Sequence, residues 1–141
     1  MRLALRRKET LMRCGLIFLL GLLASPLSAQ DIEEGAEAFV NHCAGCHGAE
    51  AKGDGPMAAL MRVPPADLTG LAEANGGVFP LAQVVERIDG TMEVKAHGGP
   101  MPVFGLLLQG PSAVAEAPDG REIVAPEEIV SIAEWLATVQ R

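Results

Sequence analysis

The 141-residue sequence predicts an all-α fold, a small domain in which short helices are joined by long loops rich in glycine and proline. Three observations lead to this prediction. Apolar residues recur at helical spacing near both ends of residues 30–141. No segment before Cys43 has the pattern of a buried strand, and the length of residues 30–141 suffices for one small domain only.

The first 29 residues are predicted to form a secretory signal peptide, cleaved after Ala29. A basic start is followed by an apolar stretch at 16–23 and an exit of small residues at 26–29. An uncleaved membrane anchor is the alternative, but residues 14–29 are interrupted by Pro26 and fall short of the roughly 18 to 20 residues that a spanning helix needs. Residues 30–141 are therefore the predicted domain.

The first helix of this domain is predicted to start at Asp31. Asp31 and Glu34 have the spacing of a capping box. Gly35, Phe39 and Cys43 then follow at intervals of four, on one face. We expect Gly35 to allow another helix to cross closely and Phe39 to pack at that crossing. The alternative is that Gly35 only weakens a surface helix and Phe39 is an ordinary core residue.

The partner at that crossing is expected to be the last helix, which opens at Pro126 and carries an apolar stripe from Ile129 to Val139. Two shorter helices are predicted between these ends, at 58–62 and at 80–88, the second stopped by Gly90. The remaining segments read as loops, at 47–56, 70–77 and 97–105. Residues 106–125 have the weakest secondary-structure pattern of the domain. Within them, Asp119-Gly120 signals a turn, which belongs either to a small hairpin or to an extra loop.

Residues 43–47 read Cys-Ala-Gly-Cys-His, the attachment signature of c-type haem. Cys43 and Cys46 are predicted to form two thioethers to one haem, and His47 to ligate its iron. A thioredoxin-like redox pair is disfavoured because no strand precedes the motif. A zinc site with His42 or His97 lacks a second pair of ligands. A structural disulfide across two residues would be strained and would close almost no loop.

Met101 is the best candidate for the second axial ligand, because Pro100 and Pro102 stiffen the backbone on both sides of it. His97 is the runner-up and would give a haem with two histidine ligands. The other candidates are Met57, Met61, Met92 and His42. The second ring nitrogen of His47 needs a fixed acceptor, and the carbonyl of Pro56 is the first choice, followed by Pro64 or Pro65.

The charge of the chain bears on its partners. Cleavage would leave 6 Lys and Arg against 17 Asp and Glu, because five of the 11 basic residues and one of the 18 acidic residues precede residue 30; the net charge is then 6 − 17 = −11. Such a surface disfavours nucleic acid and anionic lipid and favours redox partners with a basic docking face. Cys14 would leave with the signal peptide, so the exported chain would hold only the two motif cysteines. Signal and motif together predict a periplasmic location.

Several sequence motifs resemble those of the class I monohaem cytochrome c family, and the resemblance extends over most of residues 33–141. They are Gly35-x-x-x-Phe39, Cys43-x-x-Cys46-His47-Gly48, Gly53-Asp-Gly55-Pro56, Pro65-Ala-Asp-Leu-Thr69, Met101-Pro-x-Phe104 and Trp135-Leu136. The resemblance implies three to five helices around one haem, attachment at Cys43 and Cys46, and axial ligation by His47 and Met101. Pro56 and Phe104 are expected to pack against the haem. The chain departs from the mitochondrial member in lacking a basic docking ring, and 106–125 is longer than a minimal domain needs.

These expectations favour a monomeric one-electron carrier over an enzyme, with membrane contact only through a partner complex. Two alternatives stay open. One is a haem protein with an open or labile sixth position, such as a gas binder or a peroxidase-like enzyme. The other is the haem subunit of a larger dehydrogenase or oxidase.

Overall fold

The computed structural model describes residues 27–92 and 101–141, with side chains described from Ile32 onward. Most of the predicted signal peptide and the runner-up ligand His97 lie outside the described residues. Within the described part, no helix is long and apolar enough to cross a membrane.

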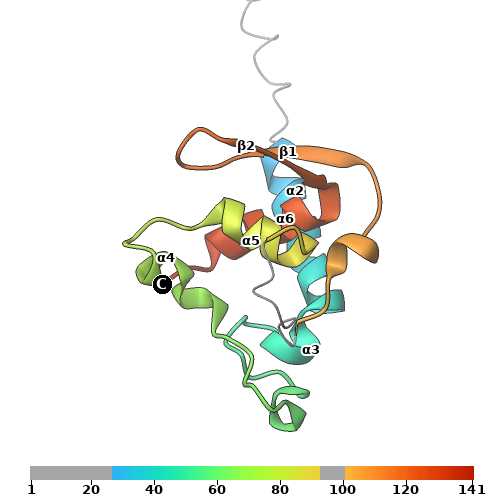
Figure 1. The fold of residues 1–141 in the computed structure, drawn as a ribbon, viewed down its shortest axis with the longest axis vertical. Coiled ribbons are helices and arrows are strands. Elements are labelled where there is room, and N and C mark those ends of the chain that lie inside the picture. The colour runs from blue at the N-terminus through green and yellow to red at the C-terminus, as the bar shows by residue number, and fades with distance from the viewer. Residues whose placement is uncertain (1–26, 93–100) are drawn as a thin grey trace, which may run out of the picture.

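Helices make up most of the regular structure, but the all-α prediction is wrong in one respect, because a two-stranded sheet is also present (Figure 1). The α-helices of the described residues are α2 (Leu27–His42), α3 (Ala44–His47), α4 (Leu71–Ala74), α5 (Leu81–Asp89) and α6 (Glu127–Thr138). Short 3-10 helices span Ala58–Leu60, Leu68–Gly70 and Phe104–Leu106, and the strands are β1 (Ser112–Glu116) and β2 (Glu122–Pro126).

Helix α2 begins earlier than predicted, at Leu27 rather than at Asp31. Residues 28–30 are Ser-Ala-Gln, which contain no helix breaker, so the helix continues through them.

The close crossing of α2 and α6 at Gly35 is confirmed. A Cβ placed on Gly35 would lie 2.0 Å from the backbone oxygen of Ser131 and 3.1 Å from Cβ of Trp135, so only glycine permits this approach. Phe39, one turn further along α2, is completely buried and packs on Trp135 with ring centroids 4.6 Å apart. This crossing, together with the predicted stripe on α6, forms the centre of the core.

The predicted helix at 80–88 is confirmed as α5. Gly90 ends it with a φ of 85°, in the left-handed region that favours glycine. The segment predicted at 58–62 is only a single 3-10 turn, and the loop predicted at 70–77 was wrong, because α4 lies within it. Helix α4 follows a capped 3-10 turn in which the Asp67 carboxylate accepts a hydrogen bond from the backbone N–H of Thr69.

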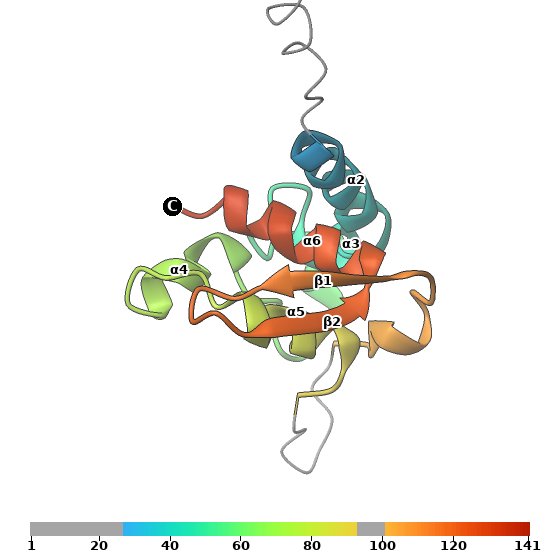
Figure 2. The same cartoon turned by 90° about the horizontal axis from the view of Figure 1, so that it is seen from above.

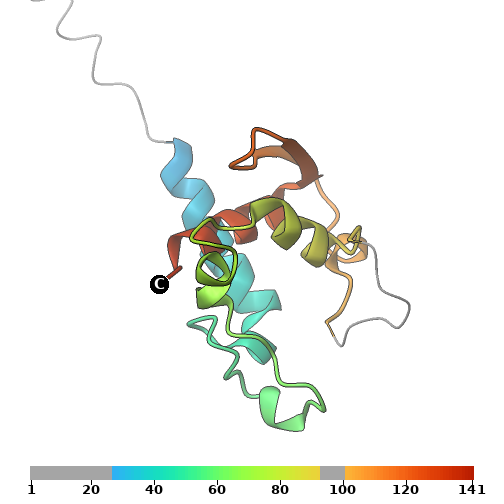
Figure 3. The same ribbon diagram turned by 60° about the vertical axis from the view of Figure 1, so that its left-hand side comes forward.

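The turn signalled by Asp119-Gly120 is confirmed, and the structure shows that it belongs to a small hairpin rather than to an extra loop. Strands β1 and β2 are antiparallel, with Val114 opposite Val124 and Ala115 opposite Ile123. The hairpin lies across one side of α6 and α5 (Figure 2). Its residues Ala115 and Ala125 are buried. The α5–α6 pair lies between the hairpin and α3 (Figures 1 and 3).

Candidate functional site

The Cys-Ala-Gly-Cys-His segment forms a single helical turn directly after α2. Cys43 separates α2 from α3, and its carbonyl accepts hydrogen bonds from the backbone N–H groups of Cys46 at 3.1 Å and His47 at 2.9 Å. The chain then leaves the turn at Gly48, whose φ is 77°. This compact turn brings both thiols and the imidazole to one cavity.

The glycine-rich loop at 53–57 supports the back of this turn. Backbone N–H groups of Gly53, Gly55 and Met57 donate to the carbonyls of His47, Cys46 and Gly45, at 2.7, 3.1 and 2.9 Å respectively. A Cβ on Gly55 would lie 2.5 Å from the Ala44 oxygen and 2.7 Å from the Cys46 carbonyl carbon. The loop therefore holds the backbone of the motif, a role that the sequence analysis missed because its partners are backbone atoms.

The acceptor for His47 is the carbonyl of Ala66, which lies 3.0 Å from Nδ1. A carbonyl oxygen only accepts, so Nδ1 carries the proton and the neutral imidazole has its lone pair on Nε2. The structure does not support Pro56 as this acceptor or as a haem-packing residue, because Pro56 is exposed and does not line the cavity. Pro64 and Pro65 line it, but the acceptor is the next residue along.

The cavity has a volume of about 430 Å³ and a mostly apolar lining. Phe39 of α2, Val84 and Ile88 of α5 and Ile132 and Leu136 of α6 contribute to its wall. Each of these five side chains also belongs to the core. The cavity thus reaches the core, and its mostly apolar lining suits a large apolar ligand.

Met101 and Phe104 both line this cavity and pack against the core. Met61 and Met92 line it as well, so the structure narrows the methionine candidates to three among the described residues. Met57 is not among the lining residues, and its side chain is 49% exposed. His42 reaches the edge of the cavity, where its Nε2 lies 3.1 Å from Oε1 of Glu128.

The two thiols form no disulfide with each other. Burial raises the pKa of the Cys43 thiol to about 11, and the neighbouring Cys46 and Glu128 act in the same direction. A redox-active Cys-x-x-Cys pair instead relies on a lowered thiol pKa. The electrostatics of this site therefore disfavour the thioredoxin-like alternative.

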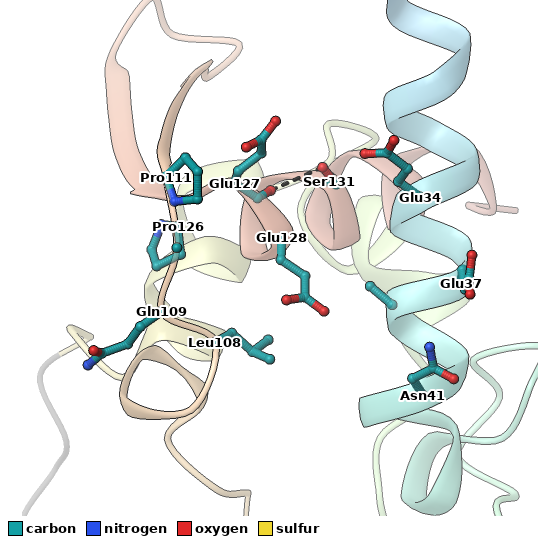
Figure 4. Close-up of a pocket in the computed structure, with 12 residues that line it drawn as sticks. Glu34, Glu37, Asn41, Leu108, Gln109, Pro111, Pro126, Glu127, Glu128 and Ser131 are labelled. Atoms are coloured by element: carbon teal, nitrogen blue, oxygen red, sulfur yellow. Dashed lines mark hydrogen bonds between the residues drawn. The ribbon is translucent and has the colours of Figure 1, made fainter.

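A second cavity, of about 490 Å³, lies between α2 and the start of α6 (Figure 4). Its lining mixes apolar and polar residues, and the carboxylates of Glu34, Glu37, Glu127 and Glu128 lie around it. Ser131 lies at its edge, where its hydroxyl donates to the backbone oxygen of Glu127 at 3.0 Å. None of the sequence-predicted site residues lines this second cavity.

Comparison with protein-family models gave a match over residues 32–140, to the family described as cytochrome c. Comparison with curated proteins gave no match. Comparison with solved structures likewise gave none. The matched range includes the motif turn, the cavity and the hairpin.

Proposed function

The chain belongs to the cytochrome c family, whose members carry covalently bound haem c and transfer electrons, and on this premise we propose that it is a one-electron carrier with His47 and Met101 as axial ligands. We further propose that it acts in the periplasm after removal of residues 1–29. The single observation that carries the ligation proposal is the hydrogen bond from Nδ1 of His47 to the Ala66 carbonyl. This bond leaves the lone pair of Nε2 available to bind iron, at a cavity that Met101 also lines.

The residues of the cavity fit the group that the family implies. Two unpaired thiols and one oriented imidazole lie at a cavity whose lining is mostly apolar. Few aromatic side chains are available to fill the core, since Tyr is absent from the sequence and Trp135 is its single tryptophan. A large apolar group in this position therefore completes the core as well as the site.

Haem c, when bound, supplies an iron that exchanges one electron between its ferrous and ferric states. The role of Cys43 and Cys46 is to hold the group through two thioethers. Ala66 keeps the His47 ring in one orientation and one tautomer, which makes Nε2 a better ligand.

Met101 is preferred over Met61 and Met92 because it has proline on both sides. The prolines restrict its backbone, so less conformational entropy is lost when the side chain binds the iron. A thioether favours ferrous iron and a closed sixth position. Closed coordination distinguishes this proposal from a gas-binding or peroxidase-like protein. The acidic surface supports brief docking to partners with a basic face, as small redox interfaces are generally weak.

The test is the optical spectrum of the ferric holoprotein, in which methionine ligation produces a charge-transfer band. We expect this band in the native protein, in Met61→Ala and in Met92→Ala, and its loss in Met101→Ala alone. Met57→Ala is the control outside the cavity. A native protein without the band, or immediate carbon monoxide binding by its ferrous form, would contradict closed ligation.

A further inference from the structure

The β1–β2 hairpin has an outward face with no assigned role. Val114 and Val124 are directly opposite each other on this face and are 60% and 67% exposed. The next residue in each strand, Ala115 after Val114 and Ala125 after Val124, points to the opposite face and is buried. The hairpin therefore packs on its inner face and presents a cross-strand valine pair on its outer face.

A pair of like charges adjoins the valines. Glu116 is directly opposite Glu122 on the same face, and such opposed Cβ atoms lie roughly 4.5–5.5 Å apart, a placement that is destabilising for like charges. Arg121 lies next in sequence, but its guanidinium is bound to Asp119 at 2.8 Å. Among the ion pairs of the described residues, neither Glu116 nor Glu122 takes part.

We propose that the outer face of the hairpin docks a partner protein that presents apolar side chains flanked by lysine or arginine. The apolar side chains would remove Val114 and Val124 from water, and the cations would offset the Glu116–Glu122 repulsion. A second copy of the chain fits poorly, because facing hairpins would bring four carboxylates together. The complementary partner is thus a different protein.

This surface is separate from the cavity. No hairpin residue lines the cavity, and α5 and α6 lie between the hairpin and the motif turn (Figures 1 and 3). A partner docked on the hairpin leaves the cavity side free for a second protein. The proposal does not depend on the redox assignment, since it rests on the hairpin alone.

The direct test uses the exported holoprotein and two synthetic peptides as probes, one alternating lysine with valine and one alternating lysine with serine. Backbone amide NMR shifts would locate binding. We expect the lysine–valine peptide to shift the amide signals of residues 112–116 and 122–126 and to bind more tightly than the lysine–serine peptide.

Glu116→Lys with Glu122→Lys is expected to weaken binding of the lysine–valine peptide about tenfold or more. The matched control, Glu33→Lys with Glu73→Lys, makes the same change in net charge on exposed residues elsewhere.

Two further variants separate docking from folding. Glu116→Gln with Glu122→Gln removes the repulsion, so the free energy of unfolding should rise while peptide affinity falls. Val114→Ser with Val124→Ser should weaken binding, whereas Val40→Ser, at an exposed valine on α2, should not. Equal affinity for both peptides, shifts outside the hairpin, equal losses in the matched control, or dimers that form through the hairpin would each overturn the proposal.

Discussion

Nδ1 of His47 donates a hydrogen bond to the backbone carbonyl of Ala66, 3.0 Å away. The two residues lie 19 positions apart in sequence, so the orientation of the His47 ring depends on how the segment around Ala66 is held. Asp67 provides that restraint. Its carboxylate accepts from the Thr69 hydroxyl at 2.6 Å and from the Thr69 backbone N–H at 2.9 Å, directly beside the Ala66 carbonyl.

This restraint predicts a pH dependence. The Thr69 hydroxyl, followed by the Thr69 amide, holds the pKa of Asp67 below its ordinary value of 3.8. A lowered pKa in the folded state stabilises the protein above the ordinary pKa, and this contribution is lost as the pH falls through the folded value. Urea unfolding at decreasing pH should therefore show a smaller loss of stability below about pH 4 in Asp67→Asn than in the native protein. An identical decline in both would contradict the role of Asp67, and Glu73→Gln serves as the control.

The Gly35 crossing predicts a large effect of a small substitution. Gly35→Ala gains about 1 kcal/mol of helix propensity, but its Cβ would meet the Ser131 oxygen at 2.0 Å and force α2 and α6 apart. We expect a net loss of about 2 kcal/mol or more in the free energy of unfolding. Gly110→Ala, where a Cβ meets nothing within 4 Å, is the control. Equal stability of the two variants would mean that the helices readjust freely.

Gly55→Ala should disturb the motif turn itself. Its Cβ would lie 2.5 Å from the Ala44 oxygen and 2.6 Å from the Gly45 oxygen, both backbone atoms that have little room to move. We expect a lower yield of haem-loaded protein and a loss of roughly 1–3 kcal/mol in stability. The ratio of haem absorbance to protein reports the yield. Native yield and stability would show that the 53–57 loop does not support the turn.

Substitution of the motif cysteines should change the mass of the exported protein. Cys43→Ala or Cys46→Ala should strongly reduce covalent haem and leave a poorly folded chain, because the cavity opens into the core. Cys14→Ala should have no effect if residues 1–29 are removed. Intact mass spectrometry of exported protein measures both attachment and cleavage. A well-folded apoprotein from either motif variant would show that the core does not depend on the haem, and a mass retaining residues 1–29 would refute cleavage.

Local sequence patterns predicted the elements that depend on local chemistry. The apolar stripe of α6, the Gly90 stop of α5 and the turn at Asp119-Gly120 are confirmed for this reason. The Ala66 acceptor and the backbone contacts of Gly55 were missed, because backbone carbonyls are the same in every residue and only the fold selects one. The start predicted at Asp31 was four residues late, because a capping pattern permits a helix start without requiring one.

The hairpin illustrates the same limit. Its turn was recognisable, but alternation in Ser-Ala-Val-Ala-Glu is weak because alanine suits either face. Only packing of Ala115 and Ala125 beneath the sheet separates the two faces. The exposed valine pair and the opposed glutamates became visible once the register was known.

The most direct test of the central claim is proton NMR of the reduced holoprotein with isotope-labelled methionine methyl groups. A methionine bound to haem iron lies over the porphyrin, and its methyl signal is shifted far upfield by the ring. The account predicts one such signal, lost in Met101→Ala and retained in Met61→Ala and Met92→Ala. Absence of any upfield methyl signal, or its loss with Met61 or Met92 instead, would contradict axial ligation by Met101.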